Sequence, residues 1–169
     1  MNNRSKTSMI TLYGVMAAVA LILSYVELQI PAFFAVPGMK LGLTNIVVVV
    51  ALYTLGNKSA LFINLIRILI AALLFGSIMS LWFSLAGGIL STIIMILLKK
   101  THLFDSIGVS AAGGITHNLG QILVAVLILE TRSIIWYLPY LLISGIISGV
   151  LIGIIGGIVA KHLNIGTQL

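Results

Sequence analysis

The 169-residue chain is 60% apolar and only 7% charged, and its mean hydropathy is +1.25. A soluble domain of this length is typically about a quarter charged, so most of the fraction that would interact with water is missing. The net charge of +6 could suggest nucleic-acid binding, but the basic residues stand at the ends of apolar runs rather than in a stripe. The absence of cysteine excludes disulfides and thiolate chemistry. We therefore expect residues 1–169 to form a single, all-α, integral membrane domain.

The polar N-terminal tail, residues 1–8, precedes an apolar run that is too long for a cleavable signal. Six apolar stretches of helical length follow, and the turns between them contain charges, Gly, Pro or Asn. The second and third are short for a hydrocarbon core that needs about 20 residues. In the last, Pro139 either sits in the first helical turn or separates a short segment, 134–138. The predicted helices are 9–26, 41–55, 60–75, 78–98, 107–129 and 134–160.

The basic residues predict the orientation of this six-helix bundle. With both termini in the cytoplasm, six lysines or arginines lie inside and two lie outside, as the positive-inside rule requires. This arrangement places segment 27–40 and turn 130–133 outside the membrane. The inside residues are Arg4, Lys6, Lys58, Lys99, Lys100 and Lys161, and the outside residues are Lys40 and Arg132.

Small residues recur every four positions in the later helices, which predicts close helix packing. The most regular series is in the last helix, and weaker series occur in the fifth and the fourth. These are Gly145, Gly149, Gly153 and Gly157; Gly108, Ala112, Thr116 and Gly120; and Ser80, Ser84 and Gly88. In the first helix, Gly14, Ala17 and Ala18 form a small-residue face that could instead contact a partner protein.

Arg67 stands in the middle of the third apolar stretch, where a charge is costly unless it faces a partner or a cavity. No acidic residue is expected in a helix core, so its counter-charge could be a bound ligand. Alternatively, Arg67 could cap backbone carbonyls or pair with Glu27 or Glu130 from a loop.

A second polar group is His117, Asn118 and Gln121 in the fifth stretch. His117 and Gln121 are four residues apart and share one helical face, and Asn118 lies about 100° around the helix. The group could line a binding cavity or could form hydrogen bonds between helices. We expect no metal site, because a single histidine without cysteine or carboxylate partners does not bind a transition metal.

Three further residues are candidates for the same site. The apolar segment 31–38 leads to Lys40 and Asn45, and it could cover an outward-facing pocket or lie in the membrane interface. Trp82 could supply flat apolar contact to a ligand, although aromatic side chains more often face lipid.

Four segments resemble the Gx transporter family, whose members are often labelled heptaprenyl diphosphate synthase component I. They are Lys-Leu-Gly-Leu-Thr-Asn at 40–45, Gly-Asn-Lys-Ser-Ala at 56–60, Arg67 followed by Phe-Gly-Ser at 75–77, and His-Asn-Leu-Gly-Gln at 117–121. The six-helix plan also resembles the substrate-binding S components of energy-coupling-factor (ECF) importers. That resemblance implies an outward-facing pocket and a first helix that docks on a membrane coupling subunit driven by ATPases. Here Gly14 and Ala18 would take the place of the docking Ala-x-x-x-Ala pair.

We do not expect this chain to be an enzyme. Prenyl diphosphate synthases hold magnesium on aspartate-rich motifs, and here Asp105, Glu27 and Glu130 are the only carboxylates. A P-loop is also absent, so active transport would need other subunits.

The sequence therefore favours an S component in a bacterial plasma membrane, without a cofactor. It would capture a small anion, aromatic or isoprenoid-related, such as 1,4-dihydroxy-2-naphthoate. The candidate binding residues are Arg67, His117, Asn118, Gln121, Lys40, Asn45 and Trp82. The alternative is a non-catalytic membrane subunit of a heptaprenyl diphosphate synthase in menaquinone biosynthesis.

Overall fold

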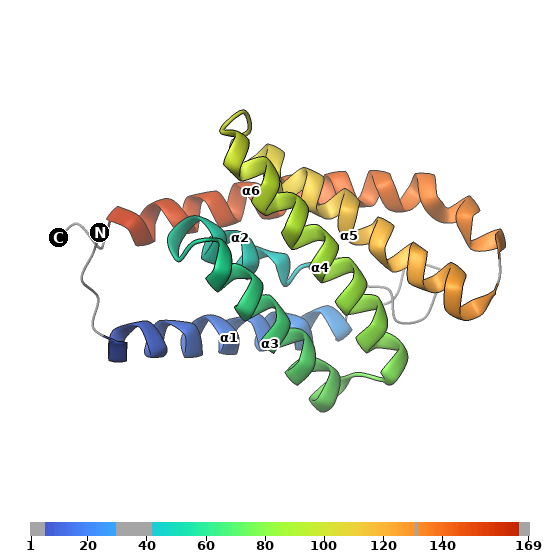
Figure 1. The fold of residues 1–169 in the computed structure, drawn as a ribbon, viewed down its shortest axis with the longest axis horizontal. Coiled ribbons are helices and arrows are strands. Elements are labelled where there is room, and N and C mark those ends of the chain that lie inside the picture. Colours follow the sequence, from blue (N-terminus) through green and yellow to red (C-terminus); the bar gives the residue numbers. More distant parts are fainter. Residues whose placement is uncertain (1–5, 30–41, 131, 166–169) are drawn as a thin grey trace.

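The computed structural model describes residues 6–29, 42–130 and 132–165, and in these residues the chain forms a bundle of helices (Figure 1). Five of the helices are long and apolar enough to cross a membrane, so the protein is a multi-pass membrane protein. The helices are α1 (Lys6–Gln29), α2 (Asn45–Thr54), α3 (Asn57–Phe75), α4 (Ile78–Thr101), α5 (Ser106–Leu129), the 3-10 helix η1 (Arg132–Tyr137) and α6 (Leu138–Ile165).

The prediction of six spanning helices is not confirmed, because α2 has only 10 residues. At 1.5 Å per residue it is about 15 Å long, roughly half the thickness of a hydrocarbon core. The expected stretch, 41–55, was already short for a span. The helix begins only at Asn45, because Gly42 has a φ of +81° and turns the chain just before it.

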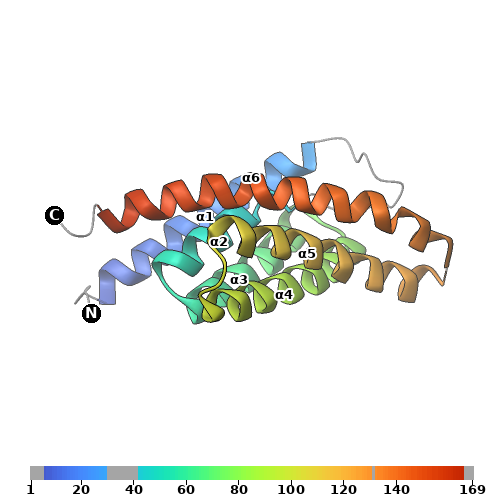
Figure 2. The same ribbon diagram turned by 90° about the horizontal axis from the view of Figure 1, so that it is seen from above.

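The position of α2 follows from its sequence. Every residue from Val47 to Leu52 is buried, so this helix is apolar on all sides and packs in the interior of the bundle. It contacts α1, α3, α4 and α6 (Figure 2). A run of four valines is a weak helix former, so burial among these neighbours stabilises α2 more than intrinsic propensity does.

Helix α1 is longer than predicted at both ends. It begins at Lys6, inside the expected polar tail, and it continues to Gln29. Glu27 was expected in an outer loop, but it lies in α1 and is buried. Lys40 and the whole of the predicted covering segment, 31–38, belong to residues 30–41, which lie outside the described part of the chain.

The last predicted helix is divided at the place that Pro139 marks. Residues 132–137 form η1, and α6 begins at Leu138, so that Pro139 lies in its first turn. The first alternative is therefore confirmed, and the segment before the proline forms a separate short helix at 132–137 rather than at 134–138. Proline suits the first turn because the N–H that it lacks has no helical partner there.

The first described residues of α1 and the last of α6 lie at the same end of the bundle (Figures 1 and 2). The start of α3 and the end of α4 lie at this end too. These helix ends carry Lys58, Lys99, Lys100 and Lys161, whereas η1, with Arg132, lies at the opposite end.

The close packing predicted for the glycine series of the last helix is confirmed, and the structure shows that its partner is α5. A Cβ atom at Gly114 would collide with the backbone oxygen of Gly145, and one at Gly149 would lie 2.6 Å from the carbonyl oxygen of Ser110. A Cβ at Gly153 would lie 2.7 Å from the Cα of Ile107. The backbones of the two helices therefore touch, a contact that only glycine permits.

Candidate binding site

Arg67 lies midway along α3 and is buried, with 4% of its surface exposed. Its Nε donates a hydrogen bond of 2.9 Å to Oδ1 of Asn64, and one terminal nitrogen donates a bond of 3.5 Å to Oδ1 of Asn45. These bonds use two of the five N–H groups of the guanidinium. Both direct acceptors are neutral amides, so the formal charge of Arg67 is not neutralised by direct contact with either of them.

Asn64 connects Arg67 to α4. Its Nδ2 donates to the carbonyl oxygen of Gly88 at 3.0 Å and to the hydroxyl of Thr92 at 2.8 Å. The approach is possible because Gly88 has no side chain, and a Cβ there would lie 3.1 Å from Asn64 Nδ2. The guanidinium is therefore held by a side chain that is itself anchored, which fixes its position.

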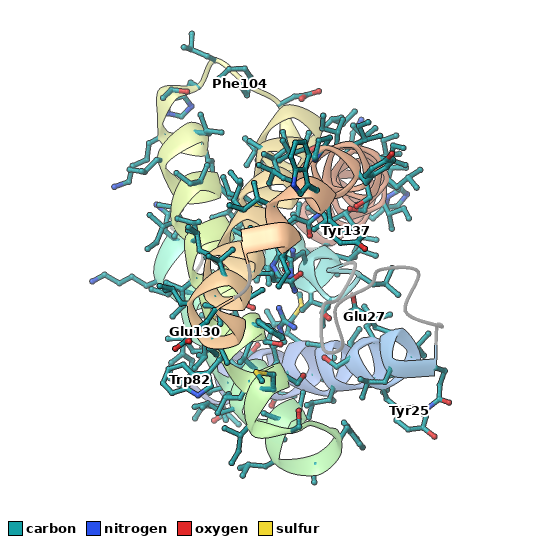
Figure 3. The ribbon with its side chains drawn as sticks, turned by 90° about the vertical axis from the view of Figure 1, so that its right-hand side faces the viewer. Tyr25, Glu27, Trp82, Phe104, Glu130 and Tyr137 are labelled. Carbon is teal, nitrogen blue, oxygen red and sulfur yellow. The ribbon has the colours of Figure 1, made fainter. Side chains whose placement is uncertain are left out.

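Glu27 approaches the same region from α1. One of its carboxylate oxygens accepts from the backbone N–H groups of Gly42, at 2.5 Å, and Leu43, at 3.1 Å, while the other accepts from the hydroxyl of Thr44 at 3.0 Å. In Figure 3, Glu27 lies on the side of α1 that faces the bundle, whereas Tyr25 lies on its outer side. Thr44, which donates to Glu27, directly precedes Asn45, which accepts from Arg67. Glu27 thus holds the turn before α2 and supplies a nearby negative charge.

His117 and Gln121 complete the arrangement from α5, where both are buried. Their Nε2 atoms lie 3.1 Å apart. A Cβ at Gly87 would lie 3.0 Å from His117 Nδ1, and a Cβ at Gly42 would lie 3.7 Å from His117 Nε2. The histidine ring therefore lies between α4 and the turn that Glu27 holds. We call Glu27, Asn45, Asn64, Arg67, His117 and Gln121 the polar centre.

The side-chain amide of Gln121 is fully buried, but not all of its hydrogen-bonding atoms have a partner among the described residues. Its Nε2 faces His117, and its Oε1 has no hydrogen-bond partner among the described residues. Turning the amide over would exchange the two atoms and leave the other one without such a partner. Because a buried polar atom without a partner is costly, this amide is suited to bind a polar group of a ligand.

Asn118 is not part of the polar centre, although sequence reasoning grouped it with its neighbours. Its Nδ2 points to α6, donating to the carbonyl oxygen of Leu141 at 2.6 Å and to the hydroxyl of Ser144 at 3.4 Å. For Asn118, this is the alternative of hydrogen bonding between helices.

Trp82 lies on the outer surface of α4, where 53% of it is exposed, and Figure 3 shows it at the edge of the bundle. The face of α1 proposed for a partner is also open. Gly14 and Ala18 are exposed, Ala17 is half-buried, and no heavy atom from elsewhere lies within 4 Å of a Cβ built at Gly14.

Two members of the polar centre were not predicted as site residues. Asn64 had a signal in the sequence, because it precedes Arg67 by three residues and so shares its helical face. Glu27 was considered only as a loop residue that could pair with Arg67, because its burial in α1 depends on how the chain turns at Gly42.

The fold and the polar centre together define a multi-pass helical membrane protein with ionisable groups buried in its interior. In such proteins a buried charge marks a functional site by default. Residues 16–159 match the family model for heptaprenyl diphosphate synthase component I, so this chain belongs to that family. No curated protein and no solved structure matches the chain.

Proposed function

We propose that this protein is the substrate-binding membrane subunit of an ECF-type importer, and that it captures a small anion at the polar centre. The observation that carries the proposal is Arg67, a buried cation whose direct acceptors are two neutral amides. A carboxylate or phosphate accepts from arginine through two parallel bonds, which is a stronger arrangement than either amide provides.

Asn45 is the contact that a ligand would replace. Its bond from Arg67, at 3.5 Å, is at the long limit for a hydrogen bond, whereas the Asn64 bond is 2.9 Å and is anchored from behind. An anion that enters beside Asn45 would therefore replace this long bond and bind Arg67 with little loss of hydrogen-bond energy. His117 and Gln121 would then bind hydroxyl or carbonyl groups of the same ligand, as in an oxygenated naphthoate such as 1,4-dihydroxy-2-naphthoate.

The arrangement of the carboxylates supports a role in binding rather than in diphosphate chemistry. Glu27 is occupied by the turn before α2, Asp105 caps the start of α5 through the N–H of Gly108, and Glu130 follows the end of α5. Since Asp105 and Glu130 lie at opposite ends of one helix, these groups do not share a magnesium ion. Import would then be driven by ATPases in other subunits.

The exposed face of α1 supports docking on a coupling subunit. Gly14 and Ala18 are one helical turn apart, and they would allow a partner helix to approach closely in the membrane. Following the positive-inside rule, we place the end of the bundle that carries the lysines on the cytoplasmic side of the plasma membrane. Both termini are then cytoplasmic.

The ligand proposal is tested by thermal unfolding of the detergent-purified protein, followed by tryptophan fluorescence, with increasing 1,4-dihydroxy-2-naphthoate. At a concentration 100 times Kd, a specific ligand stabilises the folded state by about 2.7 kcal/mol. Arg67→Ala should abolish this stabilisation, and Arg67→Lys should weaken it because lysine lacks the planar fork. Lys100→Ala removes the same charge from an exposed position and is the matched control. Equal stabilisation of the wild type and Arg67→Ala would refute the proposal.

The partner proposal is tested by purifying the tagged protein from native membranes and identifying the bound proteins by mass spectrometry. We expect a membrane coupling subunit and ATPases, and Gly14→Leu should release them. Recovery of a soluble, aspartate-rich prenyl synthase would instead support the alternative that the family description suggests.

A further inference from the structure

We propose that Glu27 determines the charge selectivity of the polar centre, making it prefer singly charged anions to doubly charged ones; this inference rests on the proposed function. Glu27 is 6% exposed, although it lies only two residues from the end of α1. Burying a carboxylate is costly unless donors compensate for the lost water, and here the turn before α2 supplies three. The fold thus places a negative charge beside the site instead of excluding it.

The hydrogen bonds of Glu27 alone do not require a carboxylate. A glutamine in its place would accept from the N–H groups of Gly42 and Leu43 through Oε1, and its amide nitrogen would donate to the hydroxyl of Thr44. The turn can therefore be held by a neutral side chain of the same shape. What the carboxylate adds is its charge, which lies on the turn directly before Asn45, one of the acceptors of Arg67.

The consequence for a ligand follows from the sum of the charges. Arg67 and Glu27 together carry no net charge, and Gln121 and both asparagines are neutral. His117 adds nothing to this sum in its neutral form. One anionic group placed on Arg67 then leaves a single excess negative charge, while a second anionic group adds repulsion from Glu27 in a medium of low dielectric constant. The polar centre should thus bind a monocarboxylate well and a dianion poorly.

Two substitutions change the net charge in opposite directions. Glu27→Gln raises it by one while preserving the hydrogen bonds, and Asn45→Asp lowers it by one at an atom that contacts Arg67. Thr44→Val is the matched control, because it removes one hydrogen bond to Glu27 and leaves every charge in place.

The experiment measures thermal stabilisation of the four purified proteins by three probes: 1,4-dihydroxynaphthalene, 1,4-dihydroxy-2-naphthoate and 1,4-naphthalenedicarboxylate. Glu27→Gln should strengthen dianion binding, relative to the neutral probe, by on the order of tenfold. Asn45→Asp should weaken the binding of both anions relative to the neutral probe, and Thr44→Val should leave the ratios unchanged. If Glu27→Gln fails to fold, Asn45→Asp still tests the dependence on charge.

Unchanged anion-to-neutral ratios in Glu27→Gln and Asn45→Asp, with wild-type binding that depends on Arg67, would overturn this inference and leave the proposed function intact. If none of the three probes stabilises the wild type, the ligand proposal itself fails. A changed ratio in Thr44→Val would show that the position of the turn, rather than charge, controls selectivity.

Discussion

His117 and Asn118 are consecutive residues of α5, but they serve two different regions of the molecule. The Asn118 amide donates to the carbonyl oxygen of Leu141 and to the hydroxyl of Ser144, both on α6. His117 lies on the other side of the helix, beside Gln121 and the turn at Gly42. Two polar side chains at the same depth thus have different roles, and the distinction comes from the neighbouring helix that each one faces.

The two regions also differ in how their polar side chains are used. Between α5 and α6, glycines bring the backbones into contact, and the amide nitrogen of Asn118 donates to acceptors on α6. At the polar centre, glycines also bring α4 and α5 together, since a Cβ at Gly87 would lie 2.8 Å from the backbone oxygen of His117, but Gln121 keeps a polar atom without a partner among the described residues. The first arrangement provides stability, and the second leaves hydrogen-bonding groups for a ligand.

The largest expected effect on stability is at the α5–α6 contact. Gly149→Leu would place side-chain atoms where the backbone of Ser110 and Ala111 now lies, and backbone cannot move aside as a side chain can. We expect a loss of about 3 kcal/mol or failure to assemble, measured by thermal unfolding in detergent. Gly14→Leu is the control on open surface, and should be neutral or stabilising by up to about 1 kcal/mol. A Gly149→Leu protein as stable as the wild type would contradict the observed contact.

Asn118→Ala should have the next largest effect. It removes the bonds to Leu141 and Ser144, and bonds between membrane helices contribute about 0.6 to 2 kcal/mol. Naphthoate binding should be unchanged, because this amide faces α6. If binding is lost while the unfolding temperature stays constant, Asn118 belongs with His117 after all.

Substitution of Lys99 tests how the end of the short helix α2 is stabilised. The Nζ of Lys99 donates to the carbonyl oxygen of Leu52, in the last turn of α2, at 2.5 Å, and lies 5.0 Å from the centre of the Tyr53 ring. Lys99→Met keeps the apolar stem and should cost about 1 kcal/mol, because the end of a helix dipole loses its cation. Lys100→Met, at the exposed neighbouring position, should change stability by less than about 0.5 kcal/mol. Equal unfolding temperatures for the two variants would argue against this role.

Gln121→Leu should have the smallest effect on stability and a clear effect on binding. The variant loses the contact with His117 but also removes the polar atom without a described partner, so we expect a net change below about 1 kcal/mol. Titration of the naphthoate should show roughly tenfold weaker binding, which is the contribution of one good hydrogen bond. Stability loss equal to that of Asn118→Ala, with unchanged binding, would remove the distinction between the two regions.

Much of the helical architecture could be predicted from the sequence, because apolar run length and glycine spacing are local properties. The long helices and the Gly145–Gly149–Gly153 contact are examples. The stretch that contains α2 was expected to be short, but the residue at which the helix begins could not be predicted from apolarity. Its start depends on the backbone at Gly42, which Glu27 holds from a different helix.

The candidate site was predicted only in part. Arg67, His117 and Gln121 are polar residues at membrane depth, so the cost of burying them identifies them from the sequence. The same argument selects Asn118, because a helical wheel gives the angle between two side chains but not the helix that each one faces. Glu27 was expected in a loop, as a partner for Arg67 at most, because a charge near the end of an apolar run is usually in contact with water.

The packing of α2 against α6 has a consequence for how the protein is made. A Cβ at Gly156 of α6 would lie 2.9 Å from the side chain of Val49, although the two residues are far apart in the sequence. During synthesis, α2 leaves the ribosome well before the helix that covers it. Ten apolar residues are too few to be retained in the bilayer as an independent segment. We therefore expect α2 to reach its buried position only after α6 has been inserted. Packing of the N-terminal half of the chain is then completed only when the last helix is in the membrane.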